Sequence, residues 1–133
     1  MRMVRMMVAT AMVLASGLAA QSARAADRIQ LDPAVVFIPP GQTTCQSGFL
    51  CLFRDALWRG GGYAIEDGHE LNDLGALGFN DEMSSWINAT SSTRFCWQPD
   101  TNYDGIAHFM DPNTAVGLVL PAENDTASSI QLC

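Results

Sequence analysis

The chain contains no lysine, and its seven basic residues are all arginine. Three of them, Arg2, Arg5 and Arg24, fall within the first 25 residues, so residues 26–133 carry four arginines against 14 acidic residues. The resulting side-chain charge of about −10 repels a phosphate backbone. The composition therefore argues against nucleic acid as a partner.

Signatures of catalysis are also missing. The chain has only two histidines, His69 and His108, and no Gly-x-Ser-x-Gly or other nucleophile signature accompanies them. The run Gly60-Gly61-Gly62 is followed by neither Lys-Ser/Thr nor a helical pattern, so it is not a phosphate loop. We therefore expect that the protein is not an enzyme, and a secreted enzyme is the weakest of three functional hypotheses.

No hydrophobic run reaches the length of a membrane span. The longest, Met6–Ala20, covers about 15 residues, whereas a spanning helix needs roughly 20. Two arginines precede this run, and small residues follow it at Ala23 and Ala25. This order is typical of a secretory signal peptide. We expect cleavage after Ala25, a secreted mature chain and no membrane association; a retained helical anchor is the alternative.

All four cysteines lie in the part expected to be exported, where oxidising conditions favour disulfides. Four cysteines allow three pairings. We favour Cys45–Cys51, which closes a short loop, and Cys96–Cys133, which ties the second half to its last strand. Zinc is the alternative, but the sequence has no Cys-x-x-Cys and its histidines are isolated.

The residue pattern from residue 26 onward predicts strands and turns. Residues 26–44 contain three prolines around the apolar run Ala34–Ile38, which indicates an N-terminal arm with one edge strand. One short helical piece is expected near Leu71–Leu77, where three leucines are spaced three apart. No other segment sustains helical periodicity, so the pattern favours an all-β domain.

An internal repeat organises the rest of the sequence. Residues 51–60 align with residues 96–105 at an offset of 45, matching cysteine, aspartate and an aromatic-x-Gly sequence. Asn80-Asp81-Glu82-Met83-Ser84-Ser85 aligns with Asn124-Asp125-Thr126-Ala127-Ser128-Ser129 at an offset of 44. We therefore divide the chain into a signal peptide (1–25), an arm (26–44) and one domain (45–133) with repeats 45–89 and 90–133.

Each repeat predicts a hairpin, a long loop and a final strand. The aromatic residue packs over the hairpin bend, and the glycine two residues later permits a positive φ or a close backbone approach. The expected strands are Leu50–Phe53, Tyr63–Glu66, Trp86–Ile87, Phe95–Gln98, Ile106–Met110 and Ile130–Leu132. Four strands per repeat around a shared interior make a Greek-key β-sandwich of two internal repeats.

These motifs resemble those of a known family. The aromatic-x-Gly hairpin followed by Asn/Asp-Asn/Asp-x-x-Ser/Thr-Ser is similar to the microbial βγ-crystallin repeat. Residues 45–55 and 73–85 resemble the secreted actinobacterial proteins grouped as peptidase inhibitor family I36. The resemblance covers about Cys45–Cys133 and implies a βγ-crystallin-type fold, bound Ca²⁺ and inhibition of a secreted protease.

Calcium fits the chemistry of the two hexapeptides. Ca²⁺ takes six to eight oxygens from carboxylates, carbonyls, hydroxyls and water. Each hexapeptide offers a carboxylate, a backbone carbonyl and a hydroxyl: Asp81, Glu82 and Ser84 in the first, Asp125, Thr126 and Ser128 in the second. The resemblance implies that the carboxylate and carbonyl of one hexapeptide meet the hydroxyl of the other. It also implies that Asn80, Ser85, Asn124 and Ser129 hold the loops.

Two alternatives stand beside these sites. The hexapeptides could be Asx and Ser turns that satisfy only local backbone groups. A second calcium pattern, Asp100-x-Asn102-x-Asp104-Gly105 with Asp111 at the twelfth place, fits an EF-hand loop. An EF-hand needs flanking helices, yet Pro99 precedes the loop and Pro112 follows it, so we interpret this segment as an acidic hairpin.

Two functional hypotheses lead. In the first, a rigid, disulfide-tied monomer presents a preorganised loop to a secreted protease. The candidate loops are Gln46–Leu50 and the connection 67–79, and no reactive bond is assigned. In the second, the chain is a calcium-stabilised extracellular binding or structural module without a protease target. Its three tryptophans could form a sugar platform, although tryptophan at strand positions is more often core.

Overall fold

The computed structural model describes residues 32–133; the expected signal peptide and the start of the arm lie outside the described residues. Within residues 32–133 the fold is all-β, as predicted. The strands are β1 (Val35–Ile38), β2 (Phe49–Asp55), β3 (Arg59–Glu66), β4 (Ser85–Asn88), β5 (Phe95–Gln98), β6 (His108–Met110), β7 (Thr114–Val116) and β8 (Ser129–Leu132). No helix among these residues has the length and apolar character needed to cross a membrane.

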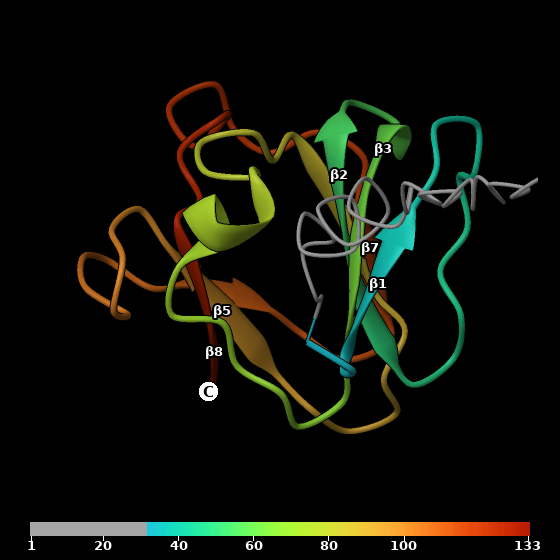
Figure 1. The fold of residues 1–133 in the computed structure, drawn as a ribbon, viewed down its shortest axis with the longest axis horizontal. Helices are drawn as coiled ribbons and strands as arrows, with labels where there is room; N and C mark the ends of the chain where they lie inside the picture. The colour runs from blue at the N-terminus through green and yellow to red at the C-terminus, as the bar shows by residue number, and fades with distance from the viewer. Residues whose placement is uncertain (1–31) are drawn as a thin grey trace, which may run out of the picture. The chain divides into compact units, whose positions relative to one another are not determined.

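The strands form two antiparallel sheets. One sheet has the order β1-β3-β2-β4-β7, and the other has the order β6-β5-β8. Figure 1 shows β5 and β8 side by side in the second sheet, with β1, β2 and β3 grouped in the first. Each sheet contains strands that are not consecutive in sequence, which is the Greek-key arrangement that the repeat predicted.

Each repeat gives one segment to the sheet of the other. β7 belongs to the second repeat but pairs with β4 of the first, through Trp86↔Val116 and Asn88↔Thr114. Reciprocally, Leu71 of the first repeat bridges to Ile130 of β8. We did not predict β7, because three residues with one partly buried side chain carry no alternating apolar pattern. This exchange makes the two repeats one folding unit.

The strand of the N-terminal arm is part of the first sheet. β1 pairs with β3 from Val35↔Ile65 to Ile38↔Gly62, and it lies at the sheet edge as expected. Gly62 sits where β3 approaches β2 most closely, because a Cβ there would lie 1.8 Å from the carbonyl oxygen of Leu52. A side chain at this position would therefore separate the two strands.

The core lies between the two sheets. Apolar side chains of the first sheet face those of the second, and the connection between β3 and β4 closes one end. The core includes Leu50, Leu52, Ile65, Leu74, Phe79, Trp86, Phe95, Trp97, Met110 and Ile130. Two of the three tryptophans are thus core residues, which disfavours the sugar-platform alternative. The predicted helical piece is shorter than expected, a 3₁₀ turn (η1, Leu74–Leu77) capped by Asp73.

The hairpins of the two repeats share an unusual backbone. Leu57 and Trp58 have φ values of +57° and +56°, and the matching Asn102 and Tyr103 have +56° and +62°. The glycine two residues after each aromatic also has a positive φ, +77° in the first repeat and +91° in the second. The aromatic-x-Gly sequence therefore marks a left-handed bend that glycine tolerates without steric cost.

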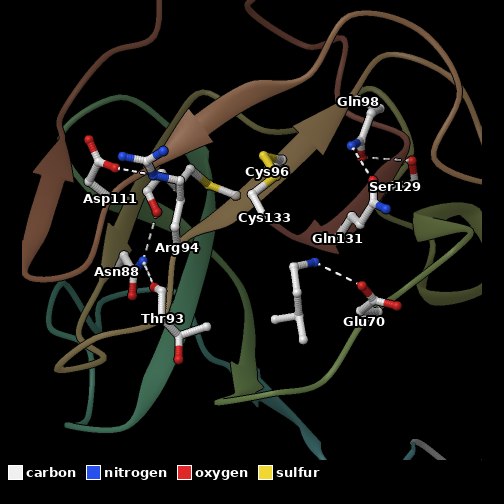
Figure 2. The surroundings of a disulfide bond; sticks show 12 residues. Glu70, Asn88, Thr93, Arg94, Cys96, Gln98, Asp111, Ser129, Gln131 and Cys133 are labelled. Carbon is white, nitrogen blue, oxygen red and sulfur yellow. Dashed lines mark hydrogen bonds and ion pairs between the residues drawn. A yellow bond between two sulfur atoms is a disulfide. The ribbon is translucent and has the colours of Figure 1, made fainter.

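Both expected disulfides are present. Cys45 pairs with Cys51, with a Cα–Cα distance of 5.8 Å, and Cys96 pairs with Cys133 at 5.9 Å. Figure 2 shows the second bridge between β5 and the chain end, beside the hydrogen bond from Gln98 Nε2 to Gln131 Oε1 (3.0 Å). No cysteine of the described residues is free, which removes the zinc alternative.

Candidate functional site

The two Asn-Asp-x-x-Ser-Ser segments lie against each other across the sandwich. The amide of Asp81 donates to the carbonyl of Ala127 (3.0 Å), and the amide of Asp125 donates to the carbonyl of Met83 (3.1 Å). These are equivalent positions of the two repeats, so the contacts are related by an approximate two-fold symmetry. Both aspartates adopt a left-handed conformation, with φ values of +55° and +54°, which this residue type tolerates better than most.

This pairing brings each carboxylate to the hydroxyl of the opposite repeat. Ser84 Oγ donates to Asp125 Oδ1 at 3.3 Å, and Ser128 Oγ donates to Asp81 Oδ1 at 3.3 Å. The aspartates are exposed, whereas both serines are buried. The structure thus forms two carboxylate–hydroxyl contacts, and each of them joins the two repeats.

The oxygen spacing in these contacts is compatible with Ca²⁺. Two ligand oxygens at about 2.3–2.6 Å from the ion and at a right angle to each other stand roughly 3.3–3.7 Å apart. The measured Ser–Asp distances fall at the lower end of that range. Within residues 32–133, moreover, the backbone carbonyls of Glu82 and Thr126 accept no hydrogen bond. The third predicted oxygen of each site is therefore available.

The surroundings of the two sites differ. An open hollow of about 310 Å³ lies at the Ser84–Asp125 site and is lined by Arg54, Asp55, Asp81, Glu82, Ser84 and Asp125. Inside it, Arg54 Nε pairs with a carboxylate oxygen of Glu82 at 2.8 Å. In the second hexapeptide the residue that matches Glu82 is Thr126, whose hydroxyl donates to the carbonyl of Glu123 (2.7 Å).

Side-chain ligands are sparse at both sites. The described residues contain no group of three or more His, Cys, Asp or Glu side chains arranged to hold a metal. Each site therefore offers one carboxylate with a hydroxyl and a carbonyl, and water would complete the coordination shell. Such a ligand set is suited to a hard cation that accepts neutral oxygens, and it is unsuited to zinc.

The last serine of each hexapeptide holds the hairpin of its own repeat. Ser85 Oγ donates to the carbonyl of Asp55 (2.6 Å) and accepts from the amide of Trp58 (3.0 Å). Ser129 Oγ makes the same two contacts with Asp100 (2.7 Å) and Tyr103 (3.2 Å). The loop that these serines support is thus the left-handed hairpin and not the hexapeptide itself.

The two asparagines behave differently from each other. Asn124 Nδ2 donates to Asp125 Oδ2 at 2.9 Å and so orients the carboxylate of that site. Its Oδ1 is buried and has no hydrogen-bond partner among residues 32–133. Asn80 is exposed, and its side chain makes no hydrogen bond within the described part of the chain. Of the two, only Asn124 has a structural basis for a supporting role.

The EF-hand alternative does not fit the structure. The segment from Asp100 to Asp111 begins just after β5 and contains β6, so strands take the place of the two helices that an EF-hand requires. The amide of Asn102 donates to the carbonyl of Asn72 (2.7 Å), which ties the bend to the connection between β3 and β4. This acidic segment is a hairpin.

The histidines have acidic partners. His108 Nδ1 lies 2.9 Å from Glu123 Oε1, and its ring stacks on Trp97 with centroids 3.9 Å apart. His69 Nε2 lies 3.0 Å from Asp32 Oδ2. Neither ring contacts a hydroxyl or thiol nucleophile through a hydrogen bond in residues 32–133. The described residues thus contain no nucleophile–base pair built on histidine.

Comparison with family models decides the family. The model of peptidase inhibitor family I36 matches residues 39–110, more than half of the chain. The chain belongs to peptidase inhibitor family I36. This family is one of peptidase inhibitors and not of enzymes. No curated protein sequence matches the chain.

Solved structures similar to this I36 chain are βγ-crystallin domains. One, from work on the evolution of the eye lens βγ-crystallin domain fold, has a TM-score of 0.62 and 19% identity, covering 74% of this chain and 96% of that one. A βγ-crystallin from Ciona intestinalis has a TM-score of 0.50 and 28% identity, covering 65% and 100%. A βγ-crystallin domain from Clostridium beijerinckii has a TM-score of 0.52 and 19% identity, covering 63% of this chain and 95% of that one. The fold is that of a βγ-crystallin, as predicted.

The structure changes both candidate inhibitory loops. The Gln46–Leu50 loop is shorter than expected, because Phe49 already lies in β2; Leu50, which was also expected to begin this strand, does lie in it and is fully buried. The connection 67–79 sends Leu74 and Phe79 into the core, so its main role is to close the sandwich. The five residues between Cys45 and Cys51 are too few for an alternating pattern to separate strand from loop.

Proposed function

We propose that the mature chain is a secreted proteinaceous peptidase inhibitor built on a calcium-stabilised βγ-crystallin scaffold. Membership of peptidase inhibitor family I36 is the observation that carries this proposal. The two disulfides support an extracellular location, because such bonds persist in oxidising compartments. The partner is then a secreted protease, and the inhibitor acts as a monomer after cleavage near Ala25.

Rigidity is what the scaffold contributes to inhibition. A loop held in its bound conformation loses little entropy on docking, so more of its contact energy appears as affinity. The exchanged strands, two disulfides and the buried core supply that rigidity. Bound Ca²⁺ would supply charge neutralisation between Asp81 and Asp125 and crosslink the repeats, while Ser84 and Ser128 would hold their positions against these carboxylates.

The test is inhibition by oxidised residues 26–133 of a panel of secreted metallo-, serine and cysteine proteases. We expect stoichiometric inhibition of at least one class, measured with a peptide substrate and a fixed enzyme concentration. Calcium dependence is probed with an Asp81→Asn/Asp125→Asn variant, because a chelator would also inactivate metalloproteases. Inhibition of no protease in the panel, by a chain shown to be folded and oxidised, would contradict the proposal.

A calcium-stabilised module without a protease target is the second candidate. The two symmetric Ser–Asp contacts favour it independently of the family, because they concern the scaffold alone. It predicts a rise in melting temperature with Ca²⁺ together with no inhibition. The two candidates are therefore separated by the protease panel and share the calcium measurement.

A further inference from the structure

The segment between β1 and β2 lies within the longest uncharged stretch of residues 26–133. No residue between Asp32 and Arg54 carries a charge, although residues 26–133 have a side-chain charge of about −10. Within this stretch, Pro39–Gly48 forms a loop that we call the neutral loop. All of its residues are exposed except Cys45 and Gly48, which are partly buried.

Turns and a disulfide hold the neutral loop at both ends. At its start, the amide of Gln42 donates to the carbonyl of Pro39 (3.2 Å) around Gly41, whose φ is +99°. At its end, the amide of Phe49 donates to the carbonyl of Gln46 (3.2 Å) around a second glycine with a φ of +87°. In the first turn, a proline is followed by a glycine with a positive φ, which is typical of a type II turn. The Cys45–Cys51 bridge fixes the loop to β2.

Between the two turns most backbone groups are free to pair with a partner, the exception being the carbonyl of Thr44, which accepts from Gln42 Nε2 (3.2 Å). The amides of residues 43–47 donate no hydrogen bond within residues 32–133. The carbonyls of Thr43 and Cys45 accept none. A segment of irregular but fixed backbone with unpaired amides and carbonyls can add as a strand to the substrate-binding edge of another protein.

The inner side of the neutral loop faces mainly apolar side chains of the first sheet. A cavity of about 170 Å³ separates the loop from the outer face of the first sheet, and its lining includes Val36, Ile38, Gln42, Gln46, Phe49 and Ala64. Across this face, Val36 pairs with Ala64, and Ala64 pairs with Cys51. Beside this cavity, Cys45 packs against the buried cluster of Ile38, Cys51, Phe53 and Ala64, which anchors the loop to the sheet while its other side faces solvent.

Resting on the proposed inhibitor function, we propose that the neutral loop is the segment that enters the catalytic cleft of the protease. Thr43–Gln46 would lie there as an extended strand, with Thr44 at its exposed centre. A charge that is buried without a partner is the costliest element of an interface. The neutral loop carries no charge, so its docking avoids this cost. Its short polar side chains suit a cleft with narrow subsites.

Other exposed surfaces meet these conditions less well. The connection 67–79 carries Asp67, Glu70 and Asp73, whose burial would need cationic partners. Leu118 and Leu120 are exposed and apolar, but the backbone around them is already paired. The amide of Val119 donates to Ser84, the amide of Leu120 donates to Glu123, and the carbonyl of Leu120 accepts two amides.

The experiment uses oxidised residues 26–133 and a protease that the wild-type chain inhibits. Thr43→Arg and Thr44→Arg are compared with Ser92→Arg, which makes the same charge change at an exposed position between β4 and β5. We expect each loop variant to raise Ki by roughly 30-fold or more, as for an interface hot spot, and the control to change it by less than about threefold. Melting temperatures of all three should equal that of the wild type.

Hydrogen exchange gives a second readout that does not depend on activity. The unpaired amides of residues 43–47 should exchange rapidly in the free chain and become protected in a complex with catalytically inactivated protease. Unchanged Ki in both loop variants, or protection confined to another surface such as Leu118–Ala122, would overturn the assignment of the loop while leaving the inhibitor function intact. If the folded chain inhibits no protease, both proposals fall together.

Discussion

Asp125 accepts a hydrogen bond from Ser84 at 3.3 Å, across 41 positions of sequence and between the two repeats. The mirror contact joins Asp81 to Ser128 at the same distance. Each contact places an exposed carboxylate against a buried hydroxyl, and the carbonyl of the residue after each aspartate accepts no hydrogen bond among the described residues. The first prediction concerns what these oxygen clusters bind.

Ca²⁺ should raise the melting temperature of oxidised residues 26–133. A ligand that binds only the folded state at 100 times its Kd stabilises it by about 2.7 kcal/mol. For a domain of this size that corresponds to an increase of roughly 10 °C or more. The measurement is thermal unfolding, monitored by circular dichroism, first in EDTA and then in millimolar Ca²⁺.

The matching variants separate specific binding from a general salt effect. Asp81→Asn/Asp125→Asn should abolish the calcium-dependent increase, whereas Asp67→Asn, an exposed aspartate outside both clusters, should retain it. An equal increase in all three proteins would mean that Ca²⁺ acts elsewhere. No increase in the wild type would mean that the hexapeptides are structural turns.

The two hairpin serines should contribute to stability by similar amounts. Ser85→Ala leaves the carbonyl of Asp55 and the amide of Trp58 without their partner, and Ser129→Ala does the same at the second hairpin. We expect each to lower the free energy of unfolding by roughly 1–3 kcal/mol. Urea unfolding measures this difference. Loss of calcium binding with unchanged stability would instead place these serines in the metal site.

The two disulfides should differ in their effect on stability. Cys96–Cys133 closes a sequence separation of 37, and Cys45–Cys51 closes one of 6. In the chain-entropy model, the two disulfides raise the free energy of unfolding by about 4 and about 2 kcal/mol, respectively. Paired Cys→Ala variants compared by urea unfolding test the order. The reverse order would show that unfolded-chain entropy is not the main contribution of these bridges.

Asn88 should be among the least replaceable polar residues of the domain. It is buried, its amide nitrogen donates to the carbonyls of Thr93 and Met110 (2.9 and 2.8 Å), and its oxygen accepts two bonds from Thr90. Figure 2 shows the bond to Thr93. Asn88→Ala leaves several buried groups unpaired and should cost roughly 2–4 kcal/mol.

The exposed Asn80 provides the control for this substitution. Its side chain makes no hydrogen bond within residues 32–133 and its φ is not positive, so Asn80→Ala should change the free energy of unfolding by less than about 0.5 kcal/mol. Similar losses in the two variants would indicate that the network around Asn88 is not specifically stabilising. No sequence signal identifies Asn88, because nothing local distinguishes a buried asparagine from one in a surface turn.

The repeat could be recognised from the sequence because its signals are local. Gly60 and Gly105 mark bends whose positive φ values glycine favours, and the hexapeptides recur at nearly the same offset. The cysteine pairing also followed from position, since Cys45 and Cys51 are close in sequence and Cys133 directly follows the last strand. Family resemblance then added the exchanged arrangement of the two hexapeptides.

The sequence by itself determined that residues 45–133 form two similar Greek-key repeats with paired oxygen-rich turns. Only the tertiary structure decided how the repeats combine: β7 crosses to β4, Leu71 bridges to Ile130, and Asp125 meets Ser84. Such contacts join segments tens of residues apart, and their energy comes from burial and hydrogen bonds that exist only after both repeats have folded. For the same reason, the unpaired amides of Thr43–Gln46 could be recognised only from the tertiary structure.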